Sequence, residues 1–210
     1  YAATSPVFNI NDKIINEFYE SINYLINNKI SIDSNIIKNN FELAQINNGI
    51  KHQLKKNINN LNLLYRYSHD GDELKMVHKK CDNHSNLLFI VETCENRKFG
   101  GFTSLTYPKG GKDENAFIFS LNNKENYYII NRKNAVYYEE RYSIMFGENT
   151  FPEFYIYYYY RDCTDHYLYC KEYIGKNNCY DYGKRNYVLS GREVTDVFDY
   201  EIFELMFSDL

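Results

Sequence analysis

The period of the hydrophobic pattern changes near residue 86, and this change constrains the fold more than any other feature of the chain. Before it, apolar residues recur three or four positions apart, as on one face of a helix. Beyond it, short runs rich in aromatic and β-branched residues alternate with turn residues, which is typical of strands. Strands are expected at residues 86–93, 97–104, 115–121, 127–130, 135–138, 154–160 and 199–207. This order predicts an α+β protein, a two-sheet antiparallel β-sandwich with peripheral helices.

Three helices are expected ahead of the strands. The first, over residues 11–29, would be capped by Asn11 or Asp12. Its apolar stripe consists of Ile14, Ile15, Phe18, Ile22, Leu25 and Ile26. A second helix is expected over residues 41–56, and a third, short helix follows Asp70, which is the residue expected to cap it.

Composition and charge exclude several classes of protein. The chain has 24 Lys and Arg against 28 Asp and Glu, a net charge of −4, which is the wrong sign for binding nucleic acid over the whole surface. Its apolar runs fall far short of the roughly 20 residues that a membrane-spanning helix needs. The five cysteines form an odd set without a C-x-x-C pair. They do not resemble a disulfide framework, so a reducing, cytoplasmic location is expected.

Glycine pairs and metal ligands are the first candidates for chemistry, and both have simpler explanations. Gly100 and Gly101 lie inside an expected strand, where paired glycines mark a bulge or a close approach of another group. The spacing His78-x-x-Cys81-x-x-His84 could contribute to a zinc site, but a fourth ligand is not apparent nearby. A buried histidine and a buried thiol account for the same residues.

Two further pairs of residues could carry catalysis. Cys163 and His166 could form a nucleophilic dyad, although a hairpin loop explains both residues. Asp70 and Glu201 could act as paired acids, but a helix cap and a carboxylate at the end of a strand are commoner roles. We therefore expect no catalytic residue, no cofactor and no metal.

Six segments of the chain, taken in order, resemble the TLDc domain family. They are residues 63–71, 77–82, 99–104, 116–121, 146–147 and 199–205, which read LLYRYSHDG, VHKKCD, FGGFTS, AFIFSL, FG and DYEIFEL. Each motif is short, and their common order makes the resemblance specific. It covers about residues 31–207. The expected organisation is therefore an N-terminal amphipathic helical extension, residues 1–30, followed by a TLDc domain, residues 31–210.

The resemblance implies a fold, a set of motif residues and a partner. The fold is the two-sheet sandwich expected from the periodicity. The motif residues, to which the resemblance assigns structural roles, are Asp70, Gly71, His78, Cys81, Gly100, Gly101 and Glu201. The implied partner is the V-ATPase, whose soluble sector such domains bind at its peripheral stalk or catalytic head. Binding would alter the assembly or activity of the pump, with a link to oxidative-stress resistance, at the cytosolic face of vacuolar or endolysosomal membranes.

The leading hypothesis is therefore a non-enzymatic interaction module. The loops of the sandwich and the first helix are its expected contact surfaces, and the helix would offer its apolar stripe to a groove of the partner, a known mode of recognition. The alternative is that this stripe packs on the chain's own sandwich. Two other functions stay open. One is a thiol-based or otherwise catalytic protein of oxidative-stress defence, using Cys81, Cys94 or another thiol. The other is a scaffold component of another large assembly.

Overall fold

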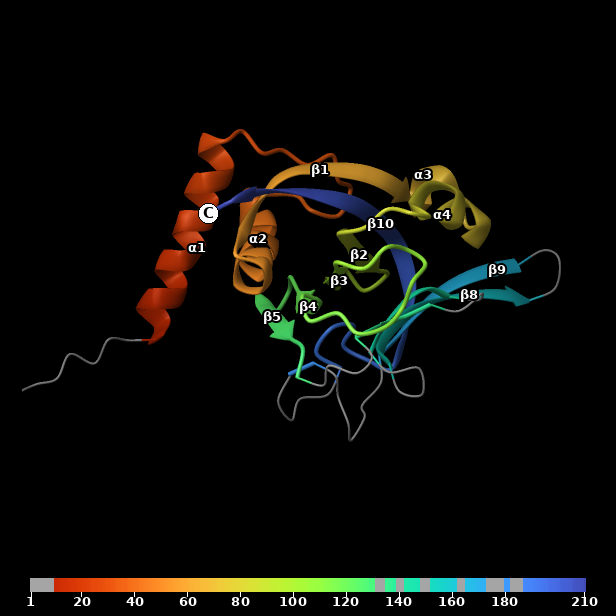
Figure 1. The fold of residues 1–210 in the computed structure, drawn as a ribbon. Coiled ribbons are helices and arrows are strands. Elements are labelled where there is room, and N and C mark those ends of the chain that lie inside the picture. Colours follow the sequence, from red (N-terminus) through yellow and green to blue (C-terminus); the bar gives the residue numbers. More distant parts are fainter. Residues whose placement is uncertain are drawn as a thin grey trace, which may run out of the picture.

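Two antiparallel sheets packed face to face form the centre of the molecule, with helices at the periphery (Figure 1). A computed structural model describes residues 10–130, 135–138, 142–147, 152–161, 165–172, 180–181 and 187–210. The two sheets and the peripheral helices confirm the expected α+β sandwich.

The larger sheet runs in the order β5-β4-β3-β2-β10, and β1 pairs with β10 as well. Its strands are β1 (Lys56–Arg66), β2 (Leu87–Thr93), β3 (Lys98–Thr103), β4 (Phe117–Ser120), β5 (Glu125–Tyr128) and β10 (Val194–Asp209). The second sheet continues from the start of β10 in the order β9-β8-β7-β6. Its strands are β6 (Val136–Tyr137), β7 (Tyr142–Gly147), β8 (Pro152–Arg161) and β9 (Asp165–Glu172). Strand β10 joins the sheets, because Val194–Asp196 pairs with β9 and the rest pairs with β1 and β2.

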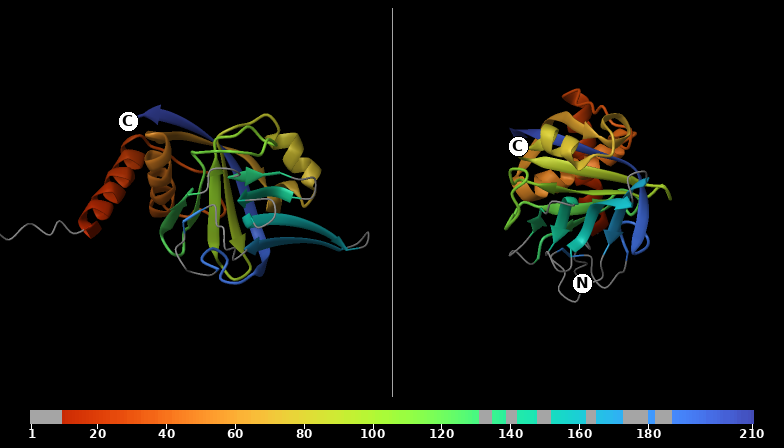
Figure 2. Two further views of the ribbon diagram at one scale, coloured as in Figure 1. Left: turned by 60° about the horizontal axis from the view of Figure 1, so that its bottom comes forward. Right: turned by 90° about the vertical axis from the view of Figure 1, so that its right-hand side faces the viewer.

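Figure 2 shows the second sheet on one side of the larger sheet and the two N-terminal helices on the other, and a hydrophobic core fills each side. One core lies between the sheets and contains Phe89 of β2, Phe146 of β7 and Phe154 of β8. Helix α4 (Leu74–Cys81) adds its apolar side to this core. The other core lies between the larger sheet and α2 (Asn40–Leu54), and helix α1 (Ile10–Asn27) packs against α2 from outside.

Three strands were missed by the sequence analysis. Strand β1 begins where the second helix was expected to end, and its several asparagines hide the alternation expected of a strand. Strand β7 was assigned to no element, and His166, which was expected in a hairpin loop, belongs to β9. All the strands that were expected are present, with ends displaced by a few residues.

Two of the expected helix caps are wrong. Helix α1 begins at Ile10, so Asn11 and Asp12 lie inside its first turn. Asp70 is the last residue of the short helix α3 (Tyr67–Asp70), and α4 starts after Glu73, whose side chain makes no capping bond. Helix α2 has the side-chain cap, because Asn39 Oδ1 accepts hydrogen bonds from the N–H groups that follow it. Among the described helices, none is long and apolar enough to cross a membrane.

Candidate functional site: a buried polar network and an apolar groove

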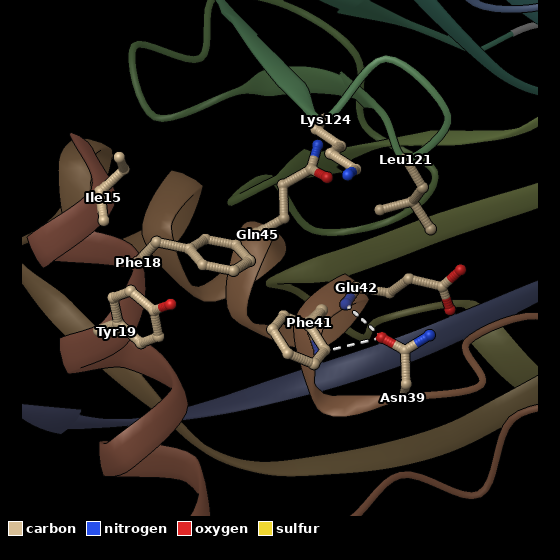
Figure 3. Close-up of a pocket in the computed structure, with 9 residues that line it drawn as sticks. All are labelled: Ile15, Phe18, Tyr19, Asn39, Phe41, Glu42, Gln45, Leu121 and Lys124. Atoms are coloured by element: carbon tan, nitrogen blue, oxygen red, sulfur yellow. Dashed lines mark hydrogen bonds between the residues drawn. The ribbon is translucent and has the colours of Figure 1, made fainter. Parts of the chain in front are cut away.

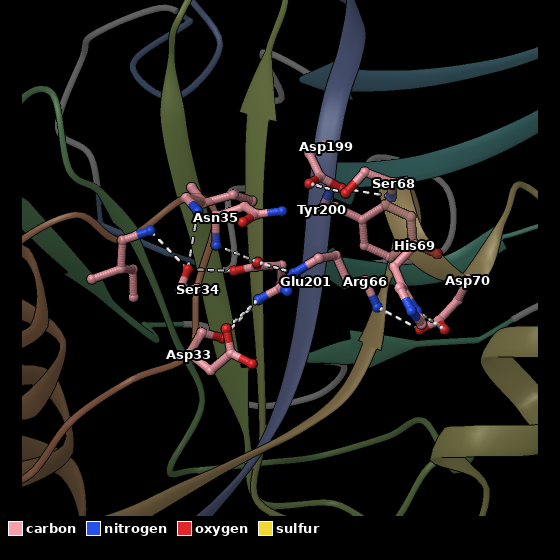
Figure 4. Close-up of polar contacts among 12 residues, drawn as sticks. Asp33, Ser34, Asn35, Arg66, Ser68, His69, Asp70, Asp199, Tyr200 and Glu201 are labelled. Carbon is pink, nitrogen blue, oxygen red and sulfur yellow. Dashed lines mark hydrogen bonds and ion pairs between the residues drawn. The ribbon is translucent and has the colours of Figure 1, made fainter.

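Glu201 of β10 is the centre of a buried polar network (Figure 4). Its side chain is inaccessible to solvent. Oε1 accepts hydrogen bonds from Arg66 Nε and from the Asn35 N–H, each at 2.7 Å. Oε2 accepts a hydrogen bond from the Ser34 hydroxyl. Glu201 therefore fastens the segment before α2 to the centre of the larger sheet.

The hydrogen bond between Ser34 and Glu201 also positions apolar residues. Ser34 Oγ accepts hydrogen bonds from the N–H groups of Ile36, at 3.0 Å, and Ile37, at 2.8 Å. Both isoleucine side chains are buried in the core beneath α2. The hydrogen bonds that run from Glu201 through Ser34 thus fix the turn that positions Ile36 and Ile37 in the core.

Arg66 of β1 carries the positive charge of the network. Its outer nitrogen donates to the Asp33 carbonyl at 2.8 Å and to the Asp33 carboxylate at 3.2 Å. Burial lowers the pKa of Arg66, but the hydrogen bonds to Glu201 and Asp33 outweigh burial and raise that pKa above its ordinary value. Arg66 therefore stays charged and pairs with the buried carboxylate of Glu201.

Asp70 connects the backbone of Arg66 to two further side chains. Its carboxylate accepts a hydrogen bond from the Arg66 N–H at 2.9 Å and pairs with Lys80 of α4 at 2.6 Å and His69 at 2.8 Å. Burial alone raises the pKa of Asp70, but these partners outweigh it and the pKa is lowered overall. Asp70 therefore links α3 to α4. Arg66 contacts both carboxylates, since its backbone N–H donates to Asp70 and its side chain donates to Glu201.

We expect Asp70→Asn to reduce the free energy of unfolding by about 1–3 kcal/mol at neutral pH, because a charged hydrogen-bond acceptor is lost. A lowered folded-state pKa means that the carboxylate stabilises the fold above its unfolded pKa, about 3.9, and loses this effect as pH falls through the folded pKa. The difference between the wild type and the variant should therefore shrink below about pH 4. Urea unfolding across this range measures it. Asp209→Asn, at an almost fully exposed carboxylate, is the control; an equal effect there would contradict the role of Asp70.

The His78, Cys81 and His84 cluster is divided among different partners. His78 Nδ1 lies 2.9 Å from Asp82 Oδ1, and His84 Nδ1 lies 3.0 Å from Glu204 Oε1 of β10. The described side chains include no group of three or more residues suited to hold a metal. Burial raises the pKa of the Cys81 thiol to about 12, so this sulfur stays protonated and poorly nucleophilic.

Cys94 is the other cysteine whose side chain belongs to the described residues. Cys94 is exposed as a residue. Desolvation of its sulfur, together with the nearby carboxylates of Asp196 and Glu95, raises the pKa of the thiol. Cys163 lies outside the described residues, as does Cys179. Cys170 and His166 belong to β9, but their side chains are outside the described part.

The three motif glycines occupy turn and contact positions. Gly71 has a φ of 89°, which other residues rarely adopt, and its carbonyl accepts a hydrogen bond from Tyr65 at 2.5 Å. In β3, a Cβ on Gly100 would lie 2.0 Å from the Phe89 carbonyl oxygen. A Cβ on Gly101 would lie 2.5 Å from the Phe146 ring of the opposite sheet. The glycine pair thus lets the strands and sheets approach closely.

A surface groove of about 630 Å³ separates α1 from the start of α2 and the turn between β4 and β5 (Figure 3). Its walls are mainly apolar or aromatic, with a few polar groups. The residues that line it include Ile15, Phe18, Tyr19, Phe41, Leu121 and Lys124. The rings of Phe18 and Phe41 stack at 6.0 Å between centroids. Ile15, Tyr19 and Phe41 keep 49%, 58% and 60% of their surface exposed.

The apolar stripe predicted on α1 is partly buried against α2 and partly exposed to solvent. Ile22 and Leu25 are buried against α2, and Phe18 is half-buried. Ile15 and Ile26 remain about half exposed. The side chain of Ile14 lies outside the described part. The stripe is thus wider than its packing on α2 requires, and its outer side borders the groove.

Sequence reasoning missed the second wall of this groove. Phe41 lies in the first turn of α2, just after the Asn39 cap. The sequence analysis placed it at the start of the second helix and gave it no further role. Leu121 and Lys124 belong to a turn whose position beside α1 depends on tertiary packing. An aromatic residue in the first turn of a helix was the only local signal.

A sandwich of two antiparallel sheets with peripheral helices defines the class of the protein, and comparison with protein families then identifies the family. The TLDc domain model matches residues 31–206, most of the chain. The chain belongs to the TLDc domain family, so the resemblance drawn from six short motifs is confirmed. Helix α1 precedes the matched residues. A search of curated proteins found no match.

Proposed function

We infer that this chain is a non-enzymatic interaction module that binds the soluble sector of the V-ATPase and alters the assembly or activity of the pump. Membership of the TLDc family, over residues 31–206, is the observation that carries this proposal. The family resemblance associates such domains with the pump and with oxidative-stress resistance. The proposed place of action is the cytosolic face of vacuolar or endolysosomal membranes.

The side chains favour binding over catalysis. The motif residues that could act chemically are engaged in the fold: Glu201 with Arg66, Asp70 with Lys80, and Cys81 in the core. The groove beside α1 instead exposes aromatic surface, which protein interfaces use for their strongest contacts. A thiol-based role would have to use another cysteine, such as Cys94.

An affinity pull-down from native lysate, read by mass spectrometry, tests the proposal. With the full chain as bait, we expect enrichment of peripheral-stalk and catalytic-head subunits of the V-ATPase. A variant with Ile15→Asp and Ile26→Asp tests α1, because both side chains are about half exposed and the fold should tolerate the changes. We expect this variant to recover less of the pump.

The matched control replaces two exposed apolar residues elsewhere, Phe198→Asp and Met206→Asp. This variant should recover the pump as the wild type does. If pump subunits are no richer with the wild-type bait than without bait, the V-ATPase assignment fails. Equal recovery by the α1 variant and the wild type would remove α1 from the contact while leaving the pump as the partner.

A further inference from the structure

The charge at the groove beside α1 specifies what could occupy it. Two of the side chains that line the groove are charged, Glu42 and Lys124. Glu42 is already neutralised, because its carboxylate pairs with Lys98 at 3.2 Å and accepts the Lys38 N–H at 2.7 Å. Lys124 is exposed and forms no ion pair with any described residue. The groove thus combines exposed aromatic walls with one uncompensated positive charge.

The polar groups around the aromatic walls are already in use. Gln45 donates its amide hydrogens to the carbonyl oxygens of Ser120, at 3.1 Å, and Glu125, at 3.0 Å. Asn39 Oδ1 accepts the two N–H groups at the start of α2. Figure 3 shows Lys124 across the groove from Tyr19 and Phe41, with Gln45 between them. A ligand would therefore meet apolar rings on one side and an ammonium group on the other.

We propose that this groove binds an acidic, aromatic-containing segment of a partner protein. A large apolar side chain of the partner lies between Tyr19 and Phe41, and a neighbouring carboxylate pairs with Lys124. The volume of about 630 Å³ falls within the roughly 300–1,000 Å³ that is typical of ligand-binding pockets. The inference rests on the proposed role as an interaction module, but it does not require the partner to belong to the V-ATPase.

A second copy of this chain fits the groove less well than an acidic segment does. A symmetric contact through this surface would bring the Lys124 side chains of the two copies toward each other. The two positive charges would repel. The exposed halves of Ile15, Tyr19 and Phe41 also supply little area compared with the roughly 800 Å² per partner of a stable interface. Area and charge therefore favour a short acidic segment.

Fluorescence anisotropy with the full chain tests the proposal. The probe is a short labelled peptide in which Phe and Leu alternate with Asp and Glu, and the matched peptide carries Lys in place of the acids. We expect the acidic peptide to bind more tightly and to weaken with added salt, since its pairing with Lys124 is exposed. Lys124→Glu should weaken binding by about tenfold or more, because attraction becomes repulsion. Phe41→Ser should have an effect of similar size.

Matched variants separate the groove from general effects of charge and hydrophobicity. Lys109→Glu changes an exposed lysine in another loop, and Phe198→Ser removes an aromatic residue that is 64% exposed. Both should bind the acidic peptide within about twofold of the wild type. Equal binding of the two peptides, absence of binding, equal loss in the controls, or a dimer by light scattering that Phe41→Ser dissociates would each overturn the proposal. Peptide binding is scored independently of pump recovery, so the two proposals can fail separately.

Discussion

Glu201→Ala should reduce the free energy of unfolding by about 3–5 kcal/mol, because it breaks a buried ion pair from one side. The substitution removes the buried carboxylate partner of the Arg66 guanidinium, whose side chain is 14% exposed, and leaves only the exposed Asp33 carboxylate. It also removes the acceptor of the Ser34 hydroxyl and the Asn35 N–H. The turn that buries Ile36 and Ile37 then loses its anchor. The energetic and structural consequences therefore act in the same direction.

Urea unfolding followed by circular dichroism measures this loss, and two variants define its origin. Asp33→Ala removes the other carboxylate on Arg66, but this side chain is 83% exposed, so we expect a loss below about 1 kcal/mol. Glu201→Gln keeps the shape and one acceptor oxygen, and should fall between the two. A loss for Glu201→Ala no larger than that for Asp33→Ala would show that the network does not stabilise the fold.

The fold class was predictable because each face of a strand or helix leaves a periodic signal in the sequence. The strands from β2 to β5 are rich in aromatic and β-branched residues, and their positions were correct within a few residues. Strand β1 was missed because Asn57, Asn59, Asn60 and Asn62 interrupt its apolar alternation. Two irregularities in its pairing with β10 shift that alternation further. Long-range pairing with β10 therefore decides its conformation.

The candidate sites were less predictable than the fold because their contacts span long stretches of sequence. Glu201 lies 135 positions from Arg66 and 167 from Ser34, so no local spacing reveals the network. The family motifs included both Glu201 and Arg66, in residues 199–205 and 63–71, but gave no sign that the two side chains pair. Likewise, the apolar stripe of α1 was visible, whereas Lys124 joins the groove only through tertiary packing. Local sequence thus identified Glu201 and the stripe of α1, whereas the second wall of the groove became visible only in the fold.

Gly101→Ala should destabilise the protein by about 1–3 kcal/mol, because the sheets have no room for the added methyl group. Its Cβ would lie 2.5–2.8 Å from three carbons of the Phe146 ring. That ring is fully buried, stacked on Phe154 at 5.0 Å and edge-on to Phe89 at 6.2 Å. It cannot move away without disturbing the core, so the strain falls on the separation of the two sheets.

A double-mutant cycle tests whether Phe146 is the cause. Phe146→Leu alone leaves a space in the core and destabilises the protein. In the double variant the methyl group added by Gly101→Ala occupies part of this space, so the two effects should be less than additive, by about 0.5–3 kcal/mol. Phe203→Leu, in the core on the other face of the larger sheet, is the control partner. It should combine with Gly101→Ala additively within about 0.5 kcal/mol. Additivity in both cycles would mean that Gly101 is required for its backbone rather than for the approach of Phe146.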